Sequence, residues 1–136
     1  MTIPWGPQFV NIVARRYYLR MGLADKQCVP CRGGVPPMPR EKAEQLLSEL
    51  DQGWALNDAE HLQHDFAFGN FVMALDFANR VGAIAEEENH HPDLHVAWGR
   101  CTVEIWTHKI SGLTESDFVF AAKVDRARQA FEAEIA

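Results

Sequence analysis

The sequence predicts a two-layer α+β domain, in which a four-stranded antiparallel sheet carries three helices on one face. Three observations support this fold class: the apolar patterns run helix, two strands, helix, two strands, helix; each strand pair is joined by a tight turn; and no parallel crossover is needed. With 136 residues, the chain is long enough for one globular core but not for two. We expect a single domain over residues 21–136, preceded by an N-terminal extension over residues 1–20 that has no clear partner segment.

The helices are predicted from apolar residues that repeat at helical spacing. The first is expected over residues 39–51, with Pro39 in its first turn. The second is expected over residues 70–88, where an acidic run closes the pattern, and the last follows Thr114, which can cap it. The apolar stripe of the second helix would consist of Phe71, Ala74, Ala78, Val81 and Ala85.

Two hairpins are predicted from alternating apolar and polar residues. The first joins residues 54–56 to residues 62–68 through a turn near Asn57. The second joins residues 94–98 to residues 101–107. With helices on one face of the sheet, the other face and both edges stay open, which predicts pairing with another subunit.

The second hairpin also predicts where a late histidine lies. Gly99 and Arg100 provide a two-residue turn, so strands of equal length would place Asp93 nearly opposite Trp106. His108 follows that register by a residue or two. We therefore expect it to return to the place where the outgoing strand begins.

The composition excludes several classes of partner. The formal charge of -6 and the acidic pI leave no basic surface that could neutralise phosphates, so no nucleic acid partner is expected. No apolar run approaches the length of roughly 20 residues that a membrane span needs, and the first residues lack the pattern of a secretory signal. We expect a cytoplasmic protein without membrane association.

The three cysteines form no disulfide framework, which suits a reducing compartment. Cys28 and Cys31 have the spacing of a zinc knuckle or a redox pair, but no second ligand pair follows, and the flanking prolines and glycines predict a loop. Cys101 lies in a predicted strand. We expect reduced thiols, with a metal or redox role for Cys28 and Cys31 as the less favoured alternative.

Four of the six histidines lie within nineteen positions of one another: His90, His91, His95 and His108. Composition alone favours an incidental polar loop. The register of the second hairpin favours a shared pocket instead, in which His90, His91 and His108 converge. Pro92 supports this arrangement, because it keeps the backbone at His91 extended.

A zinc or iron site is the other use for such a cluster. An extended turn sends the side chains of His90 and His91 in divergent directions, which favours separate contacts to an organic ligand, so the metal site ranks second. His95 is expected at the surface or at an interface, while His61 and His64 carry no motif.

Asp117 has two candidate roles. Thr114 and Asp117 have the spacing of a helix-capping box, with Asp in place of the usual Glu or Gln. At the start of a helix that follows His108, the carboxylate can also orient an imidazole or stabilise its charge. The two roles are compatible.

Several spaced motifs occur together at Glu86–Asp93, Trp98, Trp106–His108 and Gly112–Phe118. They combine paired histidines and a proline, a later aromatic, a third histidine and then an aspartate. This combination resembles the signature of the pterin-4a-carbinolamine dehydratases. The resemblance covers about residues 23–131, including a lead-in over residues 28–37. It leaves the N-terminal extension outside.

The resemblance implies dehydration of 4a-hydroxytetrahydrobiopterin, or of a related 4a-hydroxytetrahydropterin, to a quinonoid dihydropterin that an aromatic amino acid hydroxylase can use again after reduction. It implies no metal and no cofactor, a homodimer or homotetramer, and His90, His91 and His108 as the catalytic residues. Asn89 is a mild departure, since family members often carry Asp there. The implied substrate-binding residues are Glu86, Asn89, Pro92, Trp106, Thr107 and Asp117.

Imidazoles suit this reaction. Loss of the hydroxyl from C4a needs a proton for the leaving oxygen, and the N5 proton must then be accepted; a group that titrates near neutral pH can do either. The hypothesis assigns proton transfer to His90 and His108, and substrate holding to His91. The alternative is a non-catalytic scaffold or assembly chaperone on the same fold, for example for Rubisco.

Overall fold

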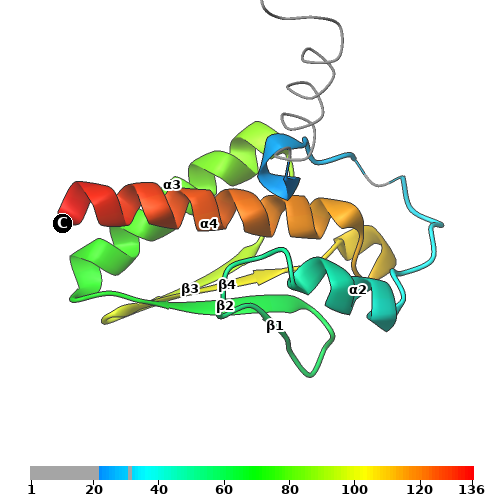
Figure 1. Ribbon diagram of the computed structural model, residues 1–136, viewed down its shortest axis with the longest axis horizontal. Helices are drawn as coiled ribbons and strands as arrows, with labels where there is room; N and C mark the ends of the chain where they lie inside the picture. Colours follow the sequence, from blue (N-terminus) through cyan, green and yellow to red (C-terminus); the bar gives the residue numbers. More distant parts are fainter. Residues whose placement is uncertain (1–21, 31) are drawn as a thin grey trace, which may run out of the picture.

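The computed structural model describes residues 22–30 and 32–136, so the predicted extension and Cys31 lie outside the described residues. Three helices and a four-stranded antiparallel sheet follow one another in the predicted order (Figure 1). Short 3-10 helices cover Leu23–Asp25 and His108–Ile110. The main elements are α2 (Arg40–Leu47), β1 (Ala55–Leu56), β2 (Leu62–Ala67), α3 (Phe71–Glu88), β3 (Asp93–Ala97), β4 (Arg100–Ile105) and α4 (Glu115–Ile135).

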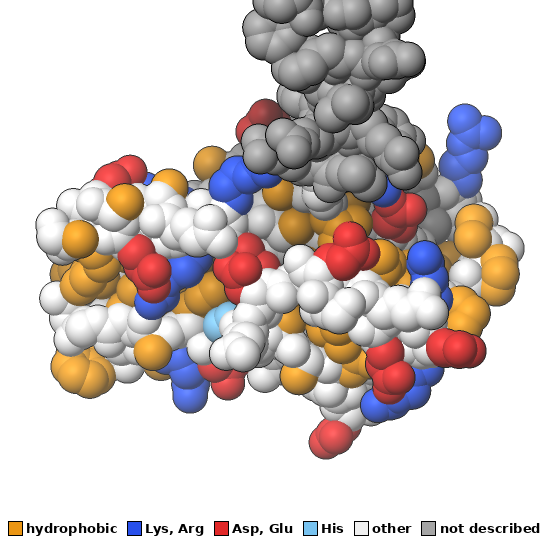
Figure 2. Space-filling model, in the orientation of Figure 1, with side chains coloured by type: hydrophobic (Ala, Val, Ile, Leu, Met, Phe, Trp, Pro, Cys, Tyr) orange, Lys and Arg blue, Asp and Glu red, His pale blue; other side chains and the backbone are white. Residues whose placement is uncertain are grey.

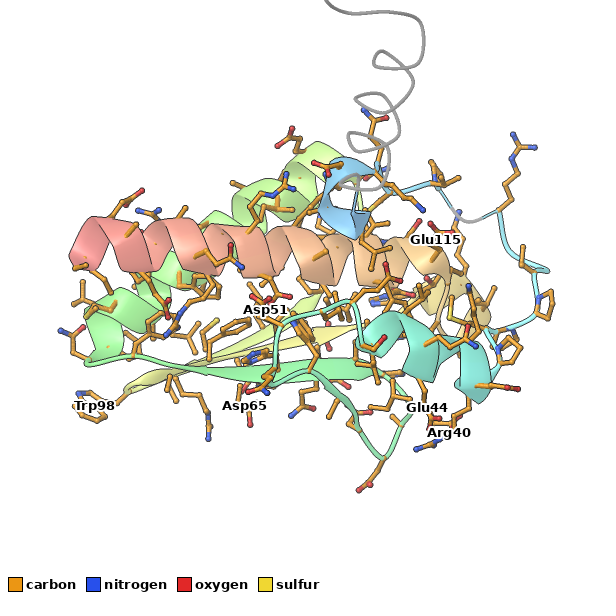
Figure 3. The ribbon with its side chains drawn as sticks, in the orientation of Figure 1. Arg40, Glu44, Asp51, Asp65, Trp98 and Glu115 are labelled. Atoms are coloured by element: carbon orange, nitrogen blue, oxygen red, sulfur yellow. The ribbon has the colours of Figure 1, made fainter. Side chains whose placement is uncertain are left out.

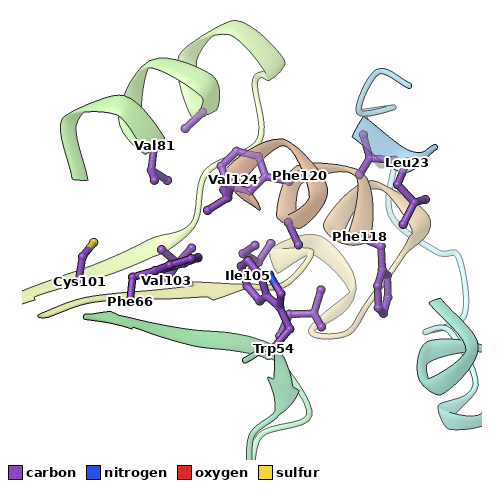
Figure 4. Packing of buried hydrophobic residues seen from close by; sticks show 14 of the residues in the cluster. Leu23, Trp54, Phe66, Val81, Cys101, Val103, Ile105, Phe118, Phe120 and Val124 are labelled. Carbon is purple, nitrogen blue, oxygen red and sulfur yellow. The ribbon is translucent and has the colours of Figure 1, made fainter. Parts of the chain in front are cut away.

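The helices lie on one side of the sheet, and the core fills the space between the two layers. In Figure 1, α3 and α4 run over the sheet, and α2 lies at one end on the same side. Figure 4 shows the inward side chains of β4 facing Val124 of α4. These inward residues are fully buried, as the alternation predicts: Cys101, Val103 and Ile105.

The two hairpins join at the centre of the sheet. The strand order is β1-β2-β4-β3, so β2 of the first hairpin pairs with β4 of the second. In this pair Leu62 lies opposite Ile105. The same register continued by one residue sets His61 opposite Trp106. Neither hairpin taken alone predicts this pairing.

The turn of the second hairpin differs from the predicted one. It consists of Trp98 and Gly99, one residue earlier than expected, and Asp93 lies opposite Glu104 rather than Trp106. Gly99 has a φ of 74° and is the third residue of the four-residue turn, a position where a positive φ favours glycine. Because the turn comes one residue earlier, each residue of β4 lies opposite a residue two positions earlier in the chain than predicted. The segment after β4 therefore lies nearer to the end of α3.

The first helix is shorter than predicted, because α2 ends at Leu47. The backbone N–H of Asp51 donates to Asp125 Oδ2 of α4 at 3.0 Å, so α4 holds this segment outside the helix. Gly53 follows with a φ of 112°, and a Cβ there would lie 2.3 Å from Nε2 of His64. The close approach of the His64 ring therefore requires glycine at this turn.

The second helix, α3, begins one residue later than predicted, at Phe71, ends at Glu88 as predicted, and has clear caps. Asn70 Oδ1 accepts a hydrogen bond from the N–H of Met73 at 2.8 Å, and Asn89 ends the helix in the left-handed region. One member of the predicted stripe is wrong, since Phe71 is 44% exposed. Phe77, which the stripe omitted, is fully buried, so the core-facing side of α3 is rotated toward Phe77 and its first turn lies at the surface.

The second face of the sheet carries polar side chains. Figure 3 shows Asp65 pointing away from the helices, and Thr102 Oγ1 donates to its carboxylate at 2.8 Å. His95 also lies on this face and is exposed, as its predicted surface position requires. Within residues 22–30 and 32–136, no helix combines the length and the apolar composition that a membrane span needs.

Candidate active site

A pocket of about 240 Å³ lies between the end of α3, the segment over residues 28–30 and the segment that follows β4. The three predicted catalytic histidines meet there. Glu86, Pro92 and Asp117, which were predicted to bind substrate, do not line the pocket. The lining residues are Cys28, Val29, Pro30, Glu88, Asn89, His90, His91, Trp106, Thr107, His108 and Lys109.

His90 is held by a buried carboxylate. Its Nε2 lies 2.6 Å from Oδ1 of Asp117, which is fully buried beneath the pocket wall. The other oxygen, Oδ2, accepts hydrogen bonds from the Thr107 hydroxyl and the Thr114 N–H, both at 2.8 Å. The predicted capping box of α4 is confirmed: the Asp117 carboxylate accepts from the backbone N–H of Thr114, and the Thr114 side chain accepts from the backbone N–H of Asp117. Asp117 therefore joins the start of α4 to an imidazole in the pocket.

His91 has a different partner. Its Nε2 lies 2.6 Å from Oε2 of Glu86 on the last turns of α3, and the two side chains are 54% and 79% exposed. The two adjacent histidines thus diverge, as the extended turn predicts, although both line one pocket. The left-handed backbone of Asn89, with a φ of 50°, turns the chain away from α3 just before them. Asn adopts this left-handed conformation readily, so Asn89 suits the backbone here although it replaces the Asp of the motif that the sequence resembles.

The third histidine, His108, follows β4 and stacks on Trp106. The two ring centres are 4.2 Å apart and the ring planes differ by 23°. The opposite face of Trp106 stacks on His61, with centres 4.0 Å apart and planes differing by 4°. Because rings cover both of its faces, Trp106 contributes an edge to the pocket. The sequence did not predict the contact of His61 with Trp106, because this contact depends on the pairing of β2 with β4.

The segment over residues 28–30 forms a wall that the sequence did not predict. The N–H of Cys28 donates to Glu88 Oε2 at 3.1 Å, and the N–H of Val29 donates to Ser116 Oγ at 2.8 Å. Glu88 also pairs with Lys123 at 2.9 Å, and the hydrogen bond from Lys123 outweighs burial and lowers the pKa of Glu88. No local motif predicts these contacts, which join residues some 60 to 90 positions apart.

The thiols in the described residues are poor nucleophiles. Burial and the neighbouring Glu88 carboxylate raise the pKa of Cys28 to about 12, and burial raises the pKa of Cys101 to about 11. Both are therefore protonated at neutral pH. In the part of the chain that the structure describes, no cluster of three or more His, Cys, Asp or Glu side chains is arranged to hold a metal ion.

His64 lies outside the pocket, on the inward face of β2. Its ring stacks on Phe66 and contacts the edge of Trp54. Burial lowers its pKa, which favours the neutral imidazole. The structure therefore gives His64 a packing role and separates it from the histidines of the pocket.

Known proteins are similar to this chain in sequence. The sequence model of the pterin 4 alpha carbinolamine dehydratase family matches residues 36–127. A protein of Rubrobacter xylanophilus is 61% identical over 104 residues, and one of Rickettsia canadensis is 55% identical over 103 residues; both are named for pterin-4-alpha-carbinolamine dehydratase. Each alignment covers 76% of this chain, and they cover 96% and 94% of the two relatives.

One solved structure agrees with this assignment. A crystal structure from Brucella melitensis, described as a transcriptional coactivator/pterin dehydratase, is 30% identical with a TM-score of 0.62, and the match covers 67% of this chain and 97% of that one. A structure described as a pterin dehydratase-like RuBisCO assembly factor is 23% identical with a TM-score of 0.48 over 56% of this chain and 89% of that one, a likeness that carries no argument about function. The family match and the curated relatives show that the chain belongs to the pterin-4a-carbinolamine dehydratase family.

Proposed function

We propose that the chain is a hydro-lyase that dehydrates 4a-hydroxytetrahydrobiopterin, or a related 4a-hydroxytetrahydropterin, to the quinonoid dihydropterin. The observation that carries this proposal is the meeting of His90, His91 and His108 in one pocket of about 240 Å³. Family membership supplies the substrate class. The product would return to the pterin cofactor cycle of an aromatic amino acid hydroxylase in the cytoplasm.

The proposed reaction needs two proton transfers. The C4a–O bond breaks as the N5 lone pair forms the C4a–N5 double bond; the leaving oxygen takes a proton and departs as water, and N5 loses its proton to a base. We assign these transfers to His90 and His108. The Asp117 carboxylate, 2.6 Å from His90, can stabilise the imidazolium that this residue carries before giving or after taking a proton.

The remaining pocket groups would hold the substrate. We assign this role to His91, oriented by Glu86, together with the polar groups of Asn89 and Thr107. Trp106 would contact the substrate through its edge, because both of its faces are occupied. The substrate is a bicyclic ring system with many donors and acceptors, which matches a pocket lined by polar groups around an aromatic edge.

A stopped-flow assay tests the proposal, with the 4a-hydroxytetrahydropterin generated in place. We expect wild type to accelerate dehydration, and His90→Ala and His108→Ala each to lower kcat by roughly 100- to 10,000-fold, the usual contribution of general acid–base catalysis. His91→Ala should raise KM more than it lowers kcat, because it removes a binding contact.

The matched control is His95→Ala, since His95 is an exposed histidine outside the pocket. It should keep wild-type kinetics. Full rates in both His90→Ala and His108→Ala would show that the catalytic assignment is wrong. A wild-type protein with no dehydratase activity would instead favour the scaffold or chaperone alternative.

A homodimer or homotetramer is part of the same proposal. Apolar side chains are exposed at one end of the molecule, visible in Figure 2 at the end where Figure 3 labels Trp98. Trp98 is 75% exposed in the second hairpin, and Phe71, Val72 and Leu75 are exposed on the first turns of α3. Large exposed apolar side chains often mark contacts between subunits. A monomer mass in analytical ultracentrifugation would contradict this prediction.

A further inference from the structure

We propose that His61 is a positioning residue of the pocket, which fixes the ring of His108 through Trp106. This inference rests on the proposed function, because it gives a role to a residue that supports one of the two proposed proton-transfer groups. His61 itself does not line the pocket.

His108 lacks the kind of partner that its two companions have. His90 and His91 each have a carboxylate oxygen 2.6 Å from Nε2. Among the described residues, the side chain of His108 makes no hydrogen bond and no ion pair, and its stacking on Trp106 at 4.2 Å is the contact that orients it. A contact that fixes the indole of Trp106 therefore also fixes the imidazole of His108.

The sheet holds the indole from its other side. Leu62 lies opposite Ile105 in the pairing of β2 with β4, so the next positions outward, His61 and Trp106, are cross-strand neighbours. Their rings are nearly parallel, at 4° and 4.0 Å, and the indole lies between two imidazoles. A ring in such a stack cannot rotate without losing contact on both faces.

His61 is anchored in turn by its backbone and by its ring. Its ring Nδ1 lies 2.8 Å from Oε2 of Glu104, and its backbone N–H donates to Oδ1 of Asn57 at 3.0 Å. Asn57 Nδ2 also donates to the same Glu104 oxygen at 2.7 Å. Burial opposes the charge on Glu104, yet the hydrogen bonds from His61 and Asn57 lower its pKa below the ordinary value. A carboxylate at neutral pH thus keeps a proton on Nδ1 of His61 and fixes its ring plane.

The chain of contacts therefore runs from Glu104 through His61 and Trp106 to His108. Its first two members are only 21% and 15% exposed, so they form a firm support. Loss of the outer imidazole would free one face of the indole, and the ring of His108 would follow. We expect such a change to lower kcat more than it raises KM, because it displaces a proton-transfer group and only loosens the edge contact that Trp106 makes with the substrate.

Proton NMR of the wild type tests the stack without reference to activity. The ring protons of His61 and His108 should both show upfield ring-current shifts from Trp106, and His61→Ala should move the His108 signals toward ordinary values. Wild-type His108 signals at ordinary values, or signals unchanged in His61→Ala, would overturn the proposal even if the protein is an active dehydratase.

Kinetics of matched variants test the consequence. His61→Ala should lower kcat by roughly 10- to 100-fold, with a smaller rise in KM through the loosened edge of Trp106. His61→Phe keeps a flat ring over Trp106 and should recover most of that loss, whereas Glu104→Gln should have a small effect of the same kind. Glu49→Gln is the control and should match wild type, because Glu49 is exposed and lies outside the pocket. A His61→Phe variant as slow as His61→Ala, while still folded by circular dichroism, would overturn the role of ring stacking.

Discussion

Two buried aspartates of α4 have opposite surroundings. Asp117, in the first turn, faces the imidazole of His90, a hydroxyl and a backbone N–H at the helix start. Asp125, eight residues later, accepts hydrogen bonds from two neutral groups among the described residues: the indole N–H of Trp54 at 2.7 Å and the backbone N–H of Asp51 at 3.0 Å. Burial raises the pKa of Asp125 to about 6, although these two bonds oppose the rise.

The difference shows what each carboxylate can do. A buried charge is costly unless a cation, a helix N-terminus or strong donors stabilise it. Asp117 has all three kinds of partner when His90 is protonated, so it can serve the pocket as well as the fold. Asp125 ties α4 to the segment around Asp51, which is labelled in Figure 3. Asp125 is not among the residues that line the pocket.

The largest expected effect comes from removing Asp117. Asp117→Ala deletes the partner of His90, the acceptor of Thr107 and half of the capping box, so the free energy of unfolding should fall by about 3–5 kcal/mol. Dehydration should fall at least as far as in His90→Ala. Urea unfolding followed by circular dichroism measures the first effect, and Asp117→Asn, which keeps one acceptor oxygen, should lose less. An unfolding free energy equal to wild type would refute the structural role of Asp117.

Asp125 should make stability fall as pH rises. Its folded pKa of about 6 lies above the ordinary value, so its contribution is fully present below about pH 4 and is lost as pH rises through 6. Two pKa units correspond to about 3 kcal/mol. The unfolding free energy of wild type relative to Asp125→Asn should therefore decrease by up to that amount between pH 4 and 8.

The matched control for this pH series is Asp58→Asn, because Asp58 is exposed in the first hairpin turn. Its difference from wild type should stay nearly constant across the same range. If the Asp125→Asn difference were equally flat, the raised pKa of Asp125 would be excluded.

The smallest effect is expected at the exposed pair of Glu86 and His91. Solvent screens this pair, so Glu86→Gln should change the unfolding free energy by less than about 1 kcal/mol, and 1 M salt should abolish the change. Any kinetic effect should appear in KM, through the orientation of His91. The neighbouring exposed Glu87→Gln is the control. A loss as large as that in Asp117→Ala would remove the contrast between the two carboxylate partners.

Local signals predicted most of the secondary structure. Thr114 was expected to cap the last helix, and it does so in the structure. The spacing of Thr114 and Asp117 predicted the capping box, because both partners lie within one helical turn. The turn of the second hairpin was misplaced by one residue, since a Trp-Gly-Arg sequence fits glycine at either central position and only the observed pairing decides between them.

The pocket was only partly predictable. His90, His91 and His108 were expected to converge because one hairpin joins them, and they line one pocket. His61 and the wall over residues 28–30 were not expected. Their contacts depend on how distant segments pack, and no local spacing encodes that.

The sequence alone determined the order of the elements, the capping box of α4, the alternation of β4 and the family resemblance, because each depends on residues that are close in the chain or on a motif. Only the tertiary structure decided that β2 pairs with β4, that Trp106 lies between His61 and His108, and that Asp117 meets His90. The physical reason is that strand register and helix docking are set by the fit of the whole core, which brings together side chains that no local pattern relates.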